Sequence, residues 1–260
     1  MINERQARIR DVLFERGELP VHDLAAHLGA SLATVRRDLK ELEEAGIIVR
    51  MHGSARIASE ARAEVAFDAR EQQNLAAKRA IASAAEAHIR EDTTIFLDAG
   101  TTVLQLARKI KLKRMPITVF TNGMIVAQEL AGVKNITVCL LGGRLREQNM
   151  SVVGPLAQAM LENIYFDQLF LGASAISDDG WISSHDADEA RANFKMAERA
   201  RQTFVLCDLS KFSDRATYSV LQLNERQHLI TNARPNTAFC QHVSDSGTEM
   251  TIAGGDIGDD

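Results

Sequence analysis

The chain has few cysteines and no long hydrophobic run. Of its 260 residues only three are cysteines, Cys139, Cys207 and Cys240, and none belongs to a CxxC pair. Their odd number and wide spacing argue against a disulfide framework or a cysteine-ligated metal, so we expect reduced thiols. No apolar stretch approaches the roughly 20 residues that span a bilayer, and the first residues lack a signal-peptide pattern. We therefore expect a cytoplasmic protein with no membrane partner.

The short motifs of several enzyme classes are also missing. The sequence contains neither GxxxxGK[ST] nor GxGxxG, so we expect no nucleoside triphosphate or dinucleotide. It lacks HExxH and GxSxG as well, and its seven histidines are scattered. Zinc-protease and serine-hydrolase chemistry therefore have no candidate residues, and we expect neither a metal nor a cofactor.

The most informative segment that is present lies near the amino terminus. A short helix is predicted over residues 21–28, and after a glycine a second helix follows in which Val35, Leu39 and Leu42 form a buried stripe. The opposite face of this second helix is polar and cationic. Two short helices joined by a tight turn, the second with a cationic outer face, form the geometry that enters a DNA major groove. The predicted DNA-contacting residues of this helix are Ser31, Thr34, Arg36, Arg37 and Lys40.

A β-hairpin is predicted directly after these helices. Two β-prone runs, residues 47–50 and 55–57, flank a turn and form a wing beside the second helix, where Arg50, His52 and Arg56 are expected to face DNA phosphates. Residues 1–57 carry nine Lys/Arg and nine Asp/Glu, so this domain has no bulk positive charge. Affinity for double-stranded operator DNA would then need two copies, and we expect a homo-oligomer, dimer or tetramer. A winged helix used only for protein contact remains the alternative.

The rest of the chain divides in outline into three parts. Residues 58–75 are polar and charged and are predicted to be a linker, in part helical. Strands and helices then alternate through residues 76–242, which predicts an α/β domain with a mainly parallel sheet covered on both faces. The Gly- and Asp-rich residues 243–260 are predicted to be a flexible tail, with an edge strand over 248–253 as the alternative.

The segment 96–102 predicts an anion site in the α/β domain. A strand ends, a glycine turn follows, and a helix begins, so the backbone N–H groups of Gly100, Thr101 and Thr102 would point outward at a helix N-terminus. This arrangement suits one phosphate group. A plain strand-to-helix turn with a threonine cap is the structural alternative.

Polar residues also follow the other predicted strands. Ligands of open α/β sheets bind beyond the carboxyl ends of the strands, so these residues predict a polyol-phosphate pocket. Asp98 and Asp208 could hold sugar hydroxyls, and Arg144, Lys195 and Lys211 could contact a phosphate. The alternatives are a solvated Lys195, a turn cap at Asp208, and a structural capping box formed by Asp186 and Glu189.

Taken together, these motifs resemble the DeoR family of bacterial transcriptional regulators, to about residue 235. The resemblance rests on Ser31-x-x-Thr34-x-Arg36-Arg37-Asp38-Leu39, the wing Arg50-Met51-His52-Gly53, Lys78-Arg79-x-Ile81-Ala82, Leu97-Asp98-x-Gly100-Thr101-Thr102, Thr121-Asn122, Leu141-Gly142-Gly143, Phe170-Leu171-Gly172 and Asp208-x-Ser210-Lys211-Phe212. One departure is Ser54, where the family commonly has a glycine in its wing.

The resemblance implies a winged helix-turn-helix domain and an effector domain similar in fold to ribose-5-phosphate isomerase and coenzyme A transferases. It also implies a repressor of sugar or polyol catabolic genes that a phosphorylated sugar or polyol releases from DNA. The matching positions are Thr34, Arg36 and Arg37 for DNA, and Asp98, Gly100, Thr101, Thr102, Asn122, Gly143 and Lys211 for the effector.

The same fold leaves an enzyme as the alternative function. Asp98, Asp186 and Asp208 with Lys195 could provide acid–base groups for a sugar-phosphate isomerase with an accessory DNA-binding domain. Because fold alone does not imply activity, and because a fused DNA-reading domain favours sensing, we expect a regulator rather than an enzyme.

Overall fold

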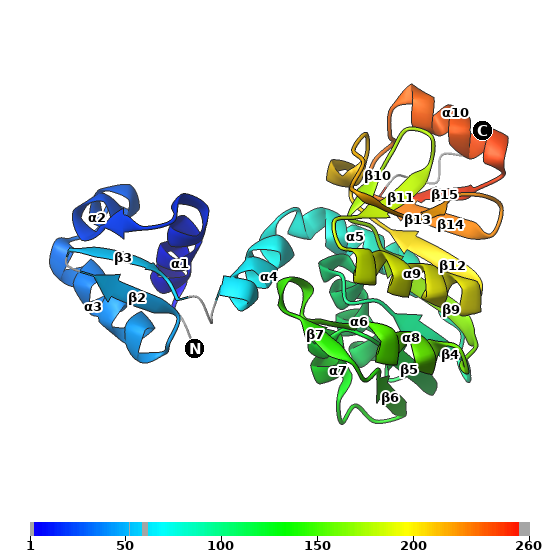
Figure 1. The fold of residues 1–260 in the computed structure, drawn as a ribbon, viewed down its shortest axis with the longest axis horizontal. Coiled ribbons are helices and arrows are strands. Elements are labelled where there is room, and N and C mark those ends of the chain that lie inside the picture. Colours follow the sequence, from blue (N-terminus) through cyan, green and yellow to red (C-terminus); the bar gives the residue numbers. More distant parts are fainter. Residues whose placement is uncertain (1–2, 52, 59–61, 255–260) are drawn as a thin grey trace. The chain divides into compact units, whose positions relative to one another are not determined.

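The computed structural model describes residues 3–51, 53–58 and 62–254, which form two compact units, residues 1–73 and 74–260 (Figure 1). In this described part of the chain, no helix combines the length and the apolar character that crossing a bilayer requires.

The first unit consists of helices and a small antiparallel sheet with the strand order β1-β3-β2. The predicted stripe of Val35, Leu39 and Leu42 is fully buried and packs against Ile9 and Leu24, so the two predicted helices and their inward face are confirmed. The elements of this unit are α1 (Glu4–Arg16), β1 (Leu19–Pro20), α2 (Val21–Leu28), α3 (Leu32–Glu44), β2 (Ile48–Met51), β3 (Ser54–Ile57) and α4 (Arg62–Gln72).

The predicted wing is present as the hairpin β2–β3. Met51 pairs with Ser54, and Gly53 takes the left-handed backbone conformation of the turn, with φ +80°. Ser54 itself begins β3 and donates its hydroxyl hydrogen to the carboxylate of Glu18. Because the left-handed position falls on Gly53, a serine at position 54 costs the wing no backbone strain.

The predicted linker is largely helical. Helix α4 fills most of residues 58–75, and the guanidinium of Arg10 in α1 lies 2.7 Å from the carboxylate of Asp68 in α4. This helix therefore belongs with the first unit, which extends beyond the predicted boundary at residue 57. The Ala, Glu and Arg residues that made the segment look like a linker are also good helix formers.

The second unit contains a seven-stranded parallel sheet, as the alternating pattern predicted. Its strand order is β15-β14-β12-β9-β4-β5-β6. Helices α5, α6 and α7 cover one face, and α8 and α9 pack on the other through a core that includes Phe96, Leu169 and Met196 (Figure 1). The strands are β4 (Thr94–Leu97), β5 (Ile117–Thr121), β6 (Ile136–Leu140), β9 (Phe166–Gly172), β12 (Ala200–Leu206), β14 (Gln227–Thr231) and β15 (Glu249–Ile252). The helices are α5 (Leu75–Glu86), α6 (Thr101–Lys113), α7 (Met124–Leu130), α8 (Pro155–Leu161), α9 (Ala187–Arg199) and α10 (Thr237–Ser246).

The prediction of a flexible tail from residue 243 is wrong as far as Gly254. Helix α10 continues to Ser246 and buries Val243, and β15 adds to the sheet as an edge strand parallel to β14. This strand confirms the edge-strand alternative. Its backbone groups pair with those of β14, which would otherwise be the edge of the sheet. Residues 255–260 lie outside the described residues.

Two small antiparallel sheets were not predicted. The hairpin β7–β8 (Arg144–Arg146 and Ser151–Val153) follows β6, and the sheet β10-β11-β13 (Ala175–Ile176, Trp181–Ser184 and Tyr218–Gln222) packs on the face that α9 and α10 cover.

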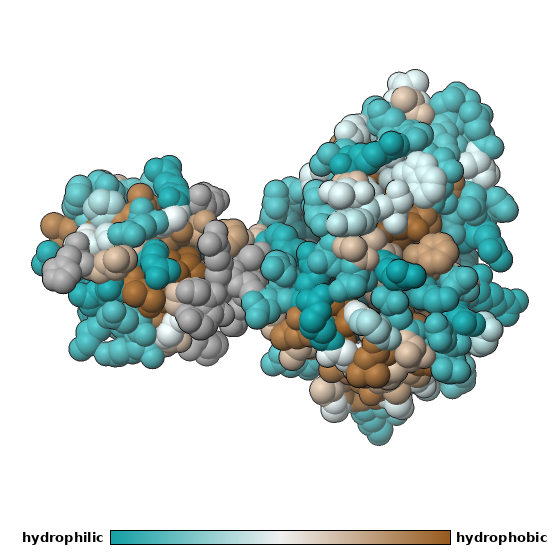
Figure 2. Space-filling view, viewed as in Figure 1, coloured by the Kyte–Doolittle hydropathy of each residue, from teal (hydrophilic) through white to brown (hydrophobic). Residues whose placement is uncertain are grey.

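Apolar side chains remain exposed around the edge strand β6. Met124, Leu140, Leu145 and Leu156 are between 38% and 62% exposed, and Figure 2 shows hydrophobic residues gathered over this part of the second unit. We call these four residues the apolar patch. A gathering of this kind is typical of a protein–protein contact surface.

Candidate functional site

Helix α3 presents a cationic face because Val35, Leu39 and Leu42 are buried on its opposite side. Arg36, Arg37 and Lys40 are exposed, and within the described residues the structure records no ion pair for either arginine. Lys40 lies 3.7 Å from the carboxylate of Glu44, an exposed pair that contributes little stability and can exchange for another anion. The two arginines are therefore the cations of this helix that are available to DNA.

The start of α3 is fixed by its own hydroxyl groups. The Ser31 side chain accepts a hydrogen bond from the Thr34 backbone N–H at 3.2 Å, and the two hydroxyl oxygens lie 2.8 Å apart. Ser31 therefore acts as the predicted helix cap. Both residues stay at the surface, so their hydroxyls can also reach a phosphate or a base edge.

An acidic residue within this cationic helix has a structural role that sequence reasoning missed. Asp38 is buried, and its carboxylate forms two hydrogen bonds with the guanidinium of Arg5 in α1, one of them at 3.0 Å. The bond raises the pKa of Arg5. This pair holds α1 against α3 and removes the negative charge of Asp38 from the outer face.

The wing contributes fewer available cations than predicted. Arg50 lies 3.6 Å from the carboxylate of Glu43, so it must exchange this partner before it can bind a phosphate. Arg56 is exposed and donates a long hydrogen bond of 3.4 Å to the carbonyl of Ile57. His52, which was also predicted to contact DNA, lies outside the described residues.

In the second unit, Asp98 follows β4 directly and is only 4% exposed. Its carboxylate accepts hydrogen bonds from the Gly172 N–H, at 3.1 Å, and from the Asn122 side chain, which follows the neighbouring strand β5. Burial and the negative charge of Glu189 raise the pKa of Asp98 to about 7, although these hydrogen bonds act in the opposite direction. A carboxyl group with this pKa can donate or accept a hydrogen bond at neutral pH.

Helix α6 begins next to Asp98. Gly100 is its N-cap, and no side chain caps the first turn within the described chain. Thr101 is half-buried and Thr102 is buried, so the first hydroxyl is the more accessible of the two. An uncapped N-terminus of a 13-residue helix provides N–H donors and a favourable dipole for an anion.

A set of buried polar residues that sequence reasoning missed extends this site. The carboxylate of Glu189 in α9 accepts hydrogen bonds from the Ser184 hydroxyl at 2.7 Å and from the Asn149 side chain at 3.1 Å. Ser151 is also buried and forms a backbone bridge with Gly123, which follows Asn122 in the chain. We call the following residues the buried polar cluster: Asp98, Asn122, Asn149, Ser151, Ser184 and Glu189.

Two atoms of this cluster have unused hydrogen-bonding capacity. The side-chain oxygens of Asn122 and Ser151 are buried and have no hydrogen-bond partner among the described residues. Leaving a buried polar atom without a partner costs about 1–3 kcal/mol. Native proteins rarely retain such atoms unless a ligand or water supplies the missing partner.

The Asp186–Glu189 capping box is only half formed. The Asp186 side chain accepts a hydrogen bond from the Glu189 N–H at 2.9 Å, as a helix cap should. The Glu189 carboxylate does not return the bond but turns to Ser184 and Asn149. The structural alternative is therefore right for Asp186, whereas Glu189 belongs to the buried polar cluster.

Lys195 does not lie with the other predicted effector residues. It follows Glu189 by six positions along α9, or about 9 Å of helix, in the direction of the amino ends of the strands. Its amine lies 2.9 Å from the carboxylate of Glu198. The prediction of an effector contact at Lys195 is not supported by this placement, because the sequence spacing did not show which end of α9 faces the site.

Arg144 and Gly143 contribute to the β7–β8 hairpin. The Arg144 guanidinium is exposed and lies 2.6 Å from the carboxylate of Asp188. Gly143 has φ +150°, and a Cβ atom there would lie 2.8 Å from the carbonyl oxygen of Val153. Only glycine fits this position, so packing within the hairpin is enough to explain why residue 143 is a glycine.

Asp208 caps a turn, which was the structural alternative. Its carboxylate oxygen accepts hydrogen bonds from the Ser210 N–H at 3.0 Å, from the Ser210 hydroxyl at 2.6 Å and from the Asn74 side chain at 3.0 Å. These bonds order a single 3₁₀ turn, Leu209–Lys211, at the carboxyl end of β12. Lys211 is half-buried and has no recorded ion pair within the described chain, which leaves its amine available.

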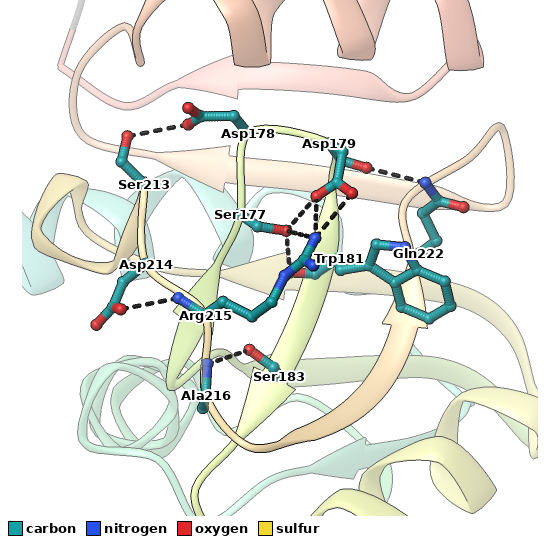
Figure 3. Close-up of polar contacts among 10 residues, drawn as sticks. All are labelled: Ser177, Asp178, Asp179, Trp181, Ser183, Ser213, Asp214, Arg215, Ala216 and Gln222. Carbon is teal, nitrogen blue, oxygen red and sulfur yellow. Dashed lines mark hydrogen bonds and ion pairs between the residues drawn. The ribbon is translucent and has the colours of Figure 1, made fainter.

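Hydrogen bonds and an ion pair connect the loop that follows Lys211 to the β10–β11 hairpin (Figure 3). One guanidinium nitrogen of Arg215 lies 2.7 Å and 2.8 Å from the two carboxylate oxygens of Asp179. The Ser213 hydroxyl donates to Asp178 at 3.0 Å, and the Ala216 N–H donates to the Ser183 hydroxyl at 2.9 Å. These contacts restrict the loop that carries Lys211.

The pKa of Asp98 predicts a pH-dependent stability. A carboxyl whose pKa is raised from 3.8 to about 7 on folding stabilises the native state fully below pH 3.8 and loses this contribution as the pH rises through 7. The Asp98→Asn variant lacks the titration. Its free energy of unfolding, relative to the wild type, should therefore rise by about 2–3 kcal/mol between pH 5 and pH 8. Urea denaturation of both proteins at the two pH values measures these free energies of unfolding. If the difference between variant and wild type is the same at pH 5 and pH 8, the raised pKa of Asp98 is contradicted.

Comparisons with known proteins agree with this two-unit organisation. Residues 5–61 match the model of the DeoR-like helix-turn-helix domain, and residues 73–233 match that of the DeoR C terminal sensor domain. Among solved structures, ribose 5-phosphate isomerase a from Methanocaldococcus jannaschii matches with a TM-score of 0.40 and 15% identity, over 54% of this chain and 55% of that chain.

Relatives match over nearly the whole chain. The HTH-type transcriptional regulator GlpR of Haloferax volcanii is 36% identical, over 95% of this chain and 96% of its own length. The putative aga operon transcriptional repressor of Escherichia coli O157:H7 is 34% identical, over 97% and 94% respectively. The HTH-type transcriptional repressor CsqR of Escherichia coli K12 is 32% identical, over 96% and 95%. These names support a regulator rather than the alternative isomerase-like enzyme, and the chain belongs to the DeoR family of DNA-binding transcriptional regulators.

Proposed function

We propose that this protein represses a sugar or polyol catabolic operon and leaves its operator DNA when a phosphorylated sugar or polyol binds the second unit. The protein would act in the cytoplasm, at the nucleoid while it is bound to DNA. The name of one relative, the putative aga operon transcriptional repressor, is compatible with control of an operon.

The observation that carries this proposal is the buried polar cluster beside the N-terminus of α6. The carboxyl group of Asp98 and the unpaired oxygen of Asn122 suit ligand hydroxyls, which both donate and accept hydrogen bonds. The uncapped N–H groups at Thr101 and Thr102 suit a phosphate, and the amine of Lys211 would add a positive charge. A ligand with hydroxyls and one phosphate matches both parts.

Effector release requires that the ligand binds one conformation better than the other. We propose that the bound phosphate orders the loops at the carboxyl ends of the strands, including the loop of Lys211, and that this conformation disfavours DNA binding. A ligand can shift the equilibrium only by its difference in affinity for the two states.

We also propose that the active form is a homo-oligomer, either a dimer or a tetramer. Residues 1–57 carry equal numbers of acidic and basic residues, so one copy makes few phosphate contacts. Two copies would place their α3 helices at half-sites about 34–36 Å apart, one turn of DNA. The apolar patch around β6 supports association, because such surfaces are usually covered in an assembly.

Isothermal titration with matched pairs of ligands tests the proposed effector class. Glycerol phosphate, tetritol and pentitol phosphates and aldose phosphates would each be compared with the same compound without its phosphate. At least one phosphorylated compound should bind, and its unphosphorylated form should bind roughly a hundredfold more weakly, since two charge-assisted hydrogen bonds are lost. Equal affinity for both members of every pair would contradict the phosphate assignment.

The contacts shown in Figure 3 predict a separate effect of Arg215. The Arg215→Ala variant should bind the effector several-fold more weakly, because the loop of Lys211 must then be ordered on binding. Its melting temperature should change little, since the pair with Asp179 is exposed. Titration and a thermal melt of the same sample measure the two quantities, and an Arg215→Lys variant shows whether charge alone suffices. Unchanged affinity in Arg215→Ala would show that this loop does not take part in binding.

A further inference from the structure

A second polar cleft lies at the opposite end of the parallel sheet. It has a volume of about 320 Å³ and is lined by residues at the starts of strands, among them Arg201 of β12, His228 of β14 and Glu249 of β15. Because these strands are parallel, their starts lie at the end of the sheet that is remote from Asp98 and the buried polar cluster. The volume is at the lower limit of the range for small-molecule sites, roughly 300–1,000 Å³.

Three arginines line this one cleft. Arg90, Arg201 and Arg226 are all exposed, and none forms a recorded ion pair within residues 3–51, 53–58 and 62–254. The lining also holds two carboxylates, Glu225 and Glu249, but no recorded ion pair within the described residues joins either of them to these arginines. The three like charges therefore repel one another, and an anion bound between them would relieve the repulsion. Guanidinium groups also offer paired N–H donors whose geometry matches a phosphate.

The remaining titratable groups of the lining indicate a ligand that carries hydroxyl groups as well as a phosphate. The Glu249 carboxylate lies 3.1 Å from Nδ1 of His228, whose other ring nitrogen lies 2.7 Å from the Thr251 hydroxyl. Burial and the neighbouring His88 lower the pKa of His228, so this histidine adds no charge at neutral pH. Glu225 has no recorded partner within the described chain and is free to accept hydrogen bonds from a hydroxyl group.

We propose that this cleft is a second ligand site, in which Arg90, Arg201 and Arg226 bind the phosphate of a small hydroxylated organic phosphate and Glu225 accepts a hydrogen bond from a hydroxyl. This site shares no residue with the proposed effector site, so an experiment can contradict either proposal and leave the other standing.

Calorimetric titration of the full-length protein with inorganic pyrophosphate tests the arginine part of this site. The wild type should bind pyrophosphate, and the Arg201→Gln/Arg226→Gln variant should bind it at this site at least a hundredfold more weakly. The matched control is Lys134→Gln/Arg191→Gln, which removes two exposed cations outside the cleft and should bind like the wild type. All the substituted residues are exposed, so the variants should keep their thermal melting temperatures.

The titrations distinguish the two sites by their stoichiometry. A Lys211→Gln variant should keep the binding step that Arg201→Gln/Arg226→Gln loses. If the double arginine variant binds pyrophosphate with the stoichiometry and affinity of the wild type, or if the wild type does not bind it, the second site is excluded. A wild type with one bound pyrophosphate, lost in the arginine variant only, would support the cleft and count against phosphate binding at α6.

Discussion

Replacing both Arg36 and Arg37 by alanine is expected to weaken binding to operator DNA by roughly a hundredfold or more. Both side chains are exposed on α3, and the structure records no ion pair for either of them within its described residues. Their loss removes two contacts with bases or phosphates from each copy, and the dependence of affinity on salt should become shallower by about two counterions per copy. Fluorescence anisotropy at several salt concentrations measures both quantities.

The control for this variant separates charge from geometry. Arg36→Lys/Arg37→Lys keeps the positive charge but loses the planar guanidinium, so it should retain non-specific DNA binding and lose preference for the operator. Both variants should keep the melting temperature of the wild type, because the substituted side chains do not belong to the buried stripe of Val35, Leu39 and Leu42. Unchanged operator binding by the double alanine variant would favour a winged helix that serves only protein contact.

The Asp98→Asn variant should bind operator DNA as the wild type does and lose its response to the effector. Asparagine has nearly the same size but cannot carry the charge or offer two carboxylate oxygens to Gly172, Asn122 and a ligand hydroxyl. A hydrogen bond to a charged group contributes about 1.5–3 kcal/mol. The effector concentration that releases half of the DNA should therefore rise roughly a hundredfold.

A matched control for this variant is Asp245→Asn, which changes an exposed carboxylate in α10. It should respond to the effector as the wild type does. If Asp98→Asn responds normally as well, the proposed pocket is misplaced. If Asp98→Asn does not bind DNA, release from DNA cannot be measured, and direct titration of the effector must replace the release experiment.

Local patterns were enough to predict α2, α3 and the wing of the first unit, whereas α1 and β1 were not predicted. The cap at Ser31, the stripe of Val35, Leu39 and Leu42 and the paired runs of the wing all depend on residues close in sequence. The parallel sheet was also predictable, because alternating apolar strands and helices permit few other arrangements. The structural role of Asp38 was not predicted, since its partner Arg5 lies 33 positions earlier and no local pattern connects them.

The candidate effector site was predictable only where it lies directly after a strand. Asp98, Asn122 and the start of α6 follow β4 and β5, so the topology of the sheet already brings them together. The contact between Asn149 and Glu189 spans 40 positions and depends on the unpredicted hairpin β7–β8. The sheet β10-β11-β13 was missed because β10 and β11 are short and because β13, which pairs with β11, comes from a distant segment.

The central claim is that a phosphorylated ligand controls DNA binding by this protein. Fluorescence anisotropy with the DNA upstream of its own gene, at one stated salt concentration and with the panel of sugar and polyol phosphates, tests it directly. The account predicts specific binding that one of these compounds weakens and that its unphosphorylated form does not. Specific binding that no member of the panel alters would contradict effector control, and the absence of any preference for this DNA would contradict its assignment as the operator.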